Sequence, residues 1–179
     1  MTINVLFTSI GRRVELLNAW KKAYTELGLS GKIIGTDIDQ LAPAAQFVDS
    51  FHLVPPTADV DFIPALRKIC TKHAIQLVFP LTDTDLPVLS ESKTDLQTTG
   101  ATVVVSDTET IAKTGNKWST YELFSACNLF TPKTWLPQDE PLSEFPLFIK
   151  PRYGSAGKHA QQINDEQELA YCLARTTDP

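Results

Sequence analysis

The chain has 179 residues, of which 42% are hydrophobic, and its 16 Lys and Arg against 21 Asp and Glu give a formal net charge of -5. This content is enough for one full domain and the beginning of a second. The negative balance excludes a positive field suited to a nucleic-acid backbone, so we expect no nucleic-acid partner. With no apolar run of membrane-spanning length and no signal-peptide pattern, we expect a cytoplasmic protein without a membrane partner.

Alternating apolar segments in the first half predict strands and helices in turn. The predicted strands lie at 3–7, 33–34, 51–54, 76–79 and 102–105, and the predicted helices at 14–27, 61–73 and 86–93. The β-branched run at 102–105 is the strongest strand signal. This alternation predicts an α/β fold with an open, doubly wound parallel sheet of the Rossmann-like type.

The rhythm changes after residue 105, which predicts two domains, 1–105 and 106–179. Ser106 with Glu109 predicts a capping box for a helix that starts near Asp107. Further elements are predicted as helices at 117–127 and 166–175, the second capped by Asp165, and as strands at 147–150 and 159–163.

Cysteines and histidines are scattered along the chain. They are Cys70, Cys127, Cys172, His52, His73 and His159. Without a CxxC pair or a histidine at metal-ligand spacing, the cysteines are expected to be reduced thiols. The histidines stand singly on different predicted elements, so packing or surface roles are expected for them.

A glycine-containing turn follows the predicted strand that delivers Lys150. Gly154 and Gly157 can adopt backbone angles closed to other residues, so successive N–H groups can turn toward one anion. Lys150 and Lys158 add positive charge there. The alternative is an ordinary hairpin, in which the glycines serve a tight turn and the lysines face water.

Two segments resemble motifs of ATP-grasp enzymes. The run FPLFIKP at 145–151, followed by GSAG at 154–157, is similar to the hydrophobic strand, Lys-Pro pair and glycine-rich loop of that family. The run TGNK at 114–117 is similar to the family's first ATP lysine segment, with Asn116 in place of the more frequent Asp. Across the whole chain, the likeness is greatest to the large subunit of carbamoyl phosphate synthase and its single-unit relatives.

The resemblance implies a nucleotide-binding role for particular residues. The residues expected to contact or cover the phosphates of ATP are Lys117, Lys150, Gly154, Ser155, Ala156, Gly157 and Lys158. The implied reaction joins a carboxylate to an amine through an acyl phosphate, with ATP and Mg²⁺ as cofactors. In the family pattern the metal ligands lie beyond Pro179. We therefore expect this chain alone to be inactive and to need the second half of the ligase, with a homo-oligomer as a further possibility.

Two turns at the carboxyl ends of predicted strands are candidates for substrate binding. Gly11 and Arg12 follow the first strand, where a helix N-terminus attracts anions. Thr82, Asp83 and Asp85 follow the strand at 76–79, where open α/β sheets gather ligands. A solvated turn in the first case, and helix capping by Asp83 or Asp85 in the second, are the alternatives.

Two other functions compete with the ligase. A dinucleotide-dependent oxidoreductase would use the same fold, and Asp37 follows the second strand as an NAD-binding acid would. However, the first turn holds one glycine where the dinucleotide fingerprint needs three. The other competitor is a non-catalytic module that binds a small metabolite.

Overall fold

A computed structural model describes residues 1–139, 144–154 and 156–175. The chain divides into two compact units, Met1–Ile111 and Ala112–Pro179, called unit 1 and unit 2 below. This division falls a little after the sequence-based boundary between residues 105 and 106. The assignment of domains to 1–105 and 106–179 stays a prediction.

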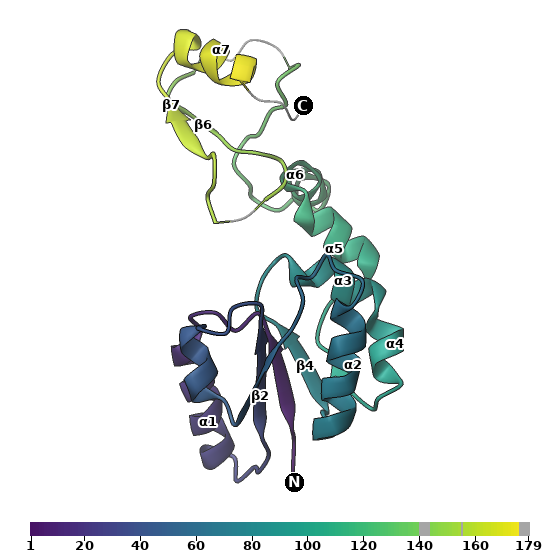
Figure 1. The fold of residues 1–179 in the computed structure, drawn as a ribbon. Coiled ribbons are helices and arrows are strands. Elements are labelled where there is room, and N and C mark those ends of the chain that lie inside the picture. Colours follow the sequence, from purple (N-terminus) through teal and green to yellow (C-terminus); the bar gives the residue numbers. More distant parts are fainter. Residues whose placement is uncertain (140–143, 155, 176–179) are drawn as a thin grey trace. The chain divides into compact units, whose positions relative to one another are not determined.

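Unit 1 is built on a five-stranded parallel sheet with strand order β3-β2-β1-β4-β5 (Figure 1). The strands are β1 (Val5–Thr8), β2 (Ile33–Asp37), β3 (Ser50–Leu53), β4 (Leu77–Pro80) and β5 (Thr102–Val103). In the register of the sheet, Val5 of β1 lies opposite Ile33 of β2 and Leu77 of β4. The predicted open parallel α/β sheet is therefore confirmed.

Helices cover both faces of this sheet (Figure 1). They are α1 (Val14–Glu26), the 3-10 helix η1 (Pro43–Phe47), α2 (Phe62–His73), α3 (Asp85–Glu91) and α4 (Lys93–Gln97). Successive side chains of a strand point to opposite faces. Accordingly, Leu6 packs with the apolar residues of α2, α3 and α4, whereas Val5 and Phe7 pack with those of α1 and η1. The central strand is thus buried on both sides, as its continuous apolar run predicts.

Unit 2 is smaller and has few buried residues. α5 (Thr108–Gly115) leads the chain into it, and its own elements are α6 (Lys117–Ala126), β6 (Leu147–Ile149), β7 (Gln161–Ile163) and α7 (Glu166–Arg175). β6 and β7 form an antiparallel pair in which Leu147 lies opposite Ile163. In the described part of unit 2, the buried residues are Asn116 and Ile163.

Two predicted elements differ in extent from the observed ones. The predicted strand at 102–105 keeps only two residues in β5, an edge strand, because Val105 turns back and its N–H donates to the carbonyl of Val103 at 3.0 Å. The predicted helix at 86–93 is two helices, α3 and α4, separated at Ser92. The 3-10 helix η1 was not predicted at all.

The cap of α5 also differs from the prediction. The side chain of Asp107, rather than Ser106, accepts from the backbone N–H of Thr110 at 2.8 Å. The bonds from Thr110 hold the pKa of the Asp107 carboxyl below its ordinary value. The predicted cap of α7 is confirmed, since Asp165 accepts from the N–H of Glu168 at 2.8 Å. In the described ranges, no helix has both the length and the apolar character needed to cross a membrane.

Candidate functional site

The carboxyl ends of β1 and β4 meet where the strand order reverses, which is where open α/β sheets bind ligands. There Thr8 Oγ1 donates to Asp85 Oδ2 at 2.6 Å, and Ser9 Oγ donates to Asp85 Oδ1 at 2.9 Å. Asp85 is fully buried. Its carboxylate therefore binds the turn after β1 to the start of α3 and fixes the shape of this edge, while direct contact of Asp85 with a substrate stays a prediction.

Asp37, at the end of β2, is engaged by its own chain. Its Oδ2 accepts from the backbone N–H of Gly11 at 2.7 Å, and its Oδ1 accepts from that of Asp39 at 2.9 Å. Only 8% of Asp37 is exposed. Since both oxygens already hold backbone groups, Asp37 is poorly placed to accept from a ribose hydroxyl, which weighs against the oxidoreductase.

The other candidate residues of this edge lie nearer the solvent. Arg12 and Asp83 are exposed, and Thr82 is half-buried. The guanidinium of Arg13 donates to the carbonyl of Leu81 at 3.1 Å and so joins the turn after β1 to the turn after β4. The fold thus places the candidates from both turns along one edge of the sheet, and their role in binding a substrate stays a prediction.

Asn116 organises the start of α6 in unit 2. Its buried side chain accepts from the backbone N–H groups of Trp118 at 2.9 Å and Ser119 at 3.3 Å, so it caps the helix. Its Nδ2 also donates to the hydroxyl of Tyr153 at 3.0 Å. An ionised Asp can accept but cannot donate. Asparagine at this position therefore keeps the cap and also donates to the segment after β6.

Lys117 makes two further bonds to that segment. Its backbone N–H donates to the carbonyl of Arg152 at 3.0 Å, and its ammonium donates to the carbonyl of Gly154 at 2.9 Å. An ammonium has three donors, so the bond to Gly154 leaves two for a ligand. Lys150, directly after β6, is exposed. The first candidate lysine and the loop that follows the second are thus in contact. We call Asn116, Lys117, Lys150 and the segment from Arg152 to Lys158 the cradle.

The loop between β6 and β7 has the expected backbone. Gly154 and Gly157 have φ of +103° and +68°, which confirms that both glycines use left-handed angles, and Ala156 has a φ of 60°. Lys158 is exposed. Ser155 lies outside the described residues. Because antiparallel strands flank this loop, the hairpin alternative describes its topology correctly, and phosphate binding by the loop stays a prediction.

Arg152 and Tyr153 were missed by the sequence analysis. Within the part of the chain that the structure describes, Arg152 Nε is buried without a hydrogen-bond partner, and the guanidinium lies 6.0 Å from the centre of the Tyr153 ring. A buried donor without a partner is costly. The only signal in the sequence was their position between Pro151 and Gly154.

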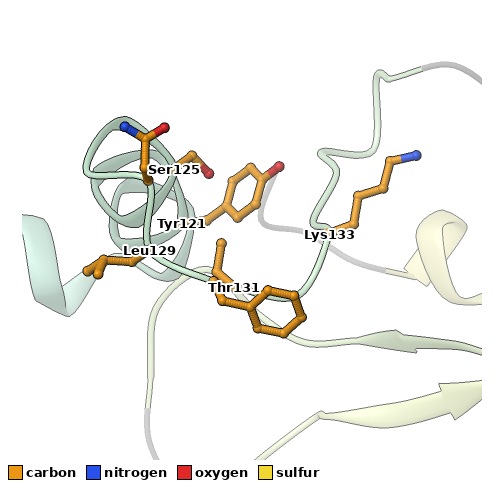
Figure 2. A pocket seen from close by; sticks show the side chains of 7 residues that line it. Tyr121, Ser125, Leu129, Thr131 and Lys133 are labelled. Carbon is orange, nitrogen blue, oxygen red and sulfur yellow. The ribbon is translucent and has the colours of Figure 1, made fainter.

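A separate open hollow of about 470 Å³ lies beside α6 (Figure 2). Its lining residues come from α6 and the segment that follows it: Tyr121, Ser125, Asn128, Leu129, Phe130, Thr131 and Lys133. Figure 2 shows Tyr121 and Lys133 on opposite sides of this hollow. None of the lining residues is a sequence-based site candidate, so the cradle and the hollow are different features of unit 2.

Two of the three histidines pack against each other, in agreement with the packing role expected for them. Nε2 of His52, on β3, lies 2.8 Å from Nε2 of His73, at the end of α2. The two residues are far apart in sequence and meet only in the folded sheet. Among the described residues no disulfide joins Cys70, Cys127 and Cys172, and burial raises the pKa of the Cys70 thiol to about 11.

Groups suited to holding a metal ion are absent from residues 1–139, 144–154 and 156–175. No three His, Cys, Asp or Glu side chains of this part cluster together. The described residues therefore do not fit a metal site built from three or more such protein ligands. That the ligands of the metal lie outside this chain stays a prediction.

A family model and several solved structures match the chain. The model described as PylC-like, N-terminal domain matches residues 5–104, which lie within unit 1 and make up more than half of the chain. A comparison with curated protein sequences gave no match.

Three solved structures share the fold over almost the whole chain. An L-amino acid ligase from Bacillus licheniformis is 19% identical with a TM-score of 0.69, over 98% of this chain and 42% of that one. N5-carboxyaminoimidazole synthetase from Staphylococcus aureus, solved with ADP, is 14% identical with a TM-score of 0.65, over 97% and 45%. The biotin carboxylase domain of 2-oxoglutarate carboxylase from Hydrogenobacter thermophilus, solved with MgADP, ADP and bicarbonate, is 16% identical with a TM-score of 0.59, over 94% and 39%.

The chain spans less than half the length of these three structures. At such low identities the likeness concerns the fold. The resemblance to ATP-grasp enzymes is confirmed at that level, together with the expected fold class of a Rossmann-like sheet followed by the first part of an ATP-grasp domain. The roles of individual residues remain to be argued from the chain itself.

Proposed function

The chain belongs to the PylC-like, N-terminal domain family, and from this premise we propose that it is the front part of an ATP-dependent carboxylate–amine ligase. In the complete protein, ATP would activate a carboxylate as an acyl phosphate that an amine then attacks. We further propose a carbamoyl phosphate synthase-like ancestry for this ligase. The ligands named in the neighbouring structures, namely ADP and MgADP, support ATP and Mg²⁺ as the cofactors.

The bond from the Lys117 ammonium to the Gly154 carbonyl carries this proposal. It places a cation of α6 beside a loop whose glycines have left-handed backbones. Phosphoryl transfer depends on positioning and on neutralising charge more than on covalent chemistry by the protein. A cationic helix start beside such a loop supplies both.

Each cradle residue has a proposed task. Lys117 and Lys150 neutralise phosphate oxygens, and Arg152 offers a buried donor that has no partner among the described residues. The loop from Gly154 to Lys158 covers the β- and γ-phosphates with its N–H groups. Asn116 fixes the start of α6 and so positions Lys117.

The acceptor substrate would bind at the carboxyl edge of the sheet in unit 1. There Gly11, Arg12, Thr82 and Asp83 are the proposed contacts, and Asp85 holds the two turns that carry them. The metal ligands would come from a longer chain, a second polypeptide or another copy, as the resemblance implies.

Nucleotide binding tests the cradle directly. We expect the ³¹P NMR resonances of ATP to shift in a saturable way when ATP is titrated with the 179-residue chain. Lys117→Ala and Lys150→Ala should each weaken binding by about tenfold, since each removes a charge-assisted contact. Lys133→Ala is the matched control, because Lys133 also belongs to unit 2 but lies over the Trp135 ring at 5.0 Å.

Three outcomes would contradict parts of the proposal. Saturable binding of NAD without binding of ATP would favour the oxidoreductase. Unchanged ATP affinity in both lysine variants would favour a module that binds some other metabolite. Release of inorganic phosphate during the titration would show that the chain alone turns over ATP, against the proposed location of the metal ligands.

A further inference from the structure

A second hollow lies in unit 1, at the amino ends of the strands. It has a volume of about 550 Å³ and is lined by Thr2, Asn4, Gly31, Lys32, Lys72, His73 and Ala74. These residues come from the start of the chain, the approach to β2 and the end of α2. The hollow thus lies at the edge of the sheet opposite to the turns that hold Asp85.

Asn4 fixes the shape of this hollow. Its Oδ1 accepts from the backbone N–H of Lys32 at 2.9 Å, and its Nδ2 donates to the carbonyl of His73 at 2.8 Å. The side-chain amide of Asn4 therefore joins the residue before β2 to the end of α2. The two lysines and the histidine are held on a defined framework rather than on a mobile loop.

The lining is cationic in an otherwise acidic chain. Lys32, Lys72 and His73 line the hollow, and no Asp or Glu does. Neither lysine forms an ion pair within the described residues. Asp49, which precedes β3, uses its carboxylate to accept from the backbone N–H of Ile33 at 2.7 Å. The positive charge around the hollow is therefore left without a carboxylate among its lining residues.

Behind His73 lies a second titratable ring. His52 Nε2 is 2.8 Å from His73 Nε2 and 3.2 Å from Ser50 Oγ. A hydrogen bond between two ring nitrogens requires one of them to lack a proton. Burial lowers the pKa of both rings, helped by His73 and Lys72 in the case of His52, and by Lys72 and Lys32 in the case of His73. Lys72 thus acts on both rings and Lys32 acts on His73.

We propose that this hollow binds a small, multiply charged oxyanion of the phosphate class, held by Lys32, Lys72 and His73. A metal cation is disfavoured there, because the lining offers two ammonium groups and no carboxylate. Lysine ammoniums suit phosphate as point charges, and a histidine that takes up a proton adds a further donor. A phosphorylated metabolite is the source that such chemistry would recognise.

The affinity should rise as the pH falls. A bound dianion favours the protonated form of His73, and this gain offsets the effect of Lys32 and Lys72 on the ring. The groups that act on His73 are Lys72 on its own helix, Lys32 before β2 and His52 on β3. Because phosphate itself titrates near neutral pH, sulfate is the better probe of this effect.

Sulfate binding to the 179-residue chain tests the proposal. We expect saturable one-to-one binding by calorimetry, stronger at about pH 5.5 than at about pH 7.5. The double variant Lys32→Gln, Lys72→Gln should weaken it at least about tenfold at either pH, because two nearby charges are lost. His73→Gln should remove most of the pH dependence.

A charge-matched control distinguishes sulfate binding at the hollow from non-specific attraction of sulfate to exposed lysines. Lys21→Gln with Lys68→Gln removes the same charge from exposed positions of α1 and α2 and should leave the affinity unchanged. Circular dichroism would show that every variant is folded. The proposal fails if sulfate does not saturate, or if the control variant loses as much affinity as the variant of the hollow.

Discussion

Two acidic side chains near the start of α3 have opposite surroundings. Asp85 is fully buried and accepts from the hydroxyls of Thr8 and Ser9, whereas Asp83 is exposed. We expect Asp85→Ala to lower the free energy of unfolding by about 2–4 kcal/mol, because it removes two hydrogen bonds and leaves the buried Thr8 hydroxyl without a partner. Urea denaturation measures this change.

Asp83→Ala is the control for that measurement. An exposed side chain without structural bonds should change the stability by no more than about 0.5 kcal/mol. Equal stability losses in the two variants would contradict the structural role that we give to Asp85. The sequence alone left capping and substrate binding open for both residues, and only their burial separates them.

The contact between β3 and α2 makes the stability depend on pH. The pKa values of His52 and His73 both lie below their ordinary value of 6.5 in the folded chain. The unfolded chain therefore binds more protons than the folded chain as the pH falls through this range. The contribution of these two histidines to stability is present above about pH 6.5 and is lost progressively below it. We expect the thermal midpoint to be lower at about pH 5.5 than at about pH 7.5.

Variants of this pair show whether the histidines cause the effect. The double variant His52→Gln, His73→Gln should have a smaller fall in the midpoint over the same pH range. The thermal midpoint of the His159→Gln variant should fall as much as that of the unmodified chain, since His159 is exposed in unit 2. An unchanged pH dependence in the double variant would assign the effect to other groups. These measurements need a buffer without phosphate or sulfate, which would occupy the proposed anion site.

The two units differ in how much apolar surface they bury. Both core clusters belong to unit 1, whereas α6 and α7 of unit 2 have no buried residue. Burial is the main stabilising contribution to folding. We therefore expect amides of β1, β2 and β4 to exchange hydrogen at least about tenfold more slowly than those of α6 and α7, as measured by mass spectrometry. Uniform protection across both units would contradict this prediction.

Sequence alone determined the elements with strong local signals. The apolar run before Thr8, the helical periodicity of α1 and α2, and the Asp165 cap all depend on neighbouring residues, which local physics governs. The same holds for Lys117 and Lys150, which were found through short motifs. The length of β5 was mispredicted, because strand length at a sheet edge depends on pairing rather than on propensity. The break between α3 and α4 at Ser92 was mispredicted as well.

Tertiary structure decided which distant residues meet. The contacts of Thr8 with Asp85, of His52 with His73, and of Lys117 with Gly154 each join segments that no local pattern connects. They depend on strand order, register and the crossing of helices, which result from the packing of the whole core. The sequence therefore supplied the candidate residues and the family, while the fold supplied the partner of each side chain and thereby its proposed task.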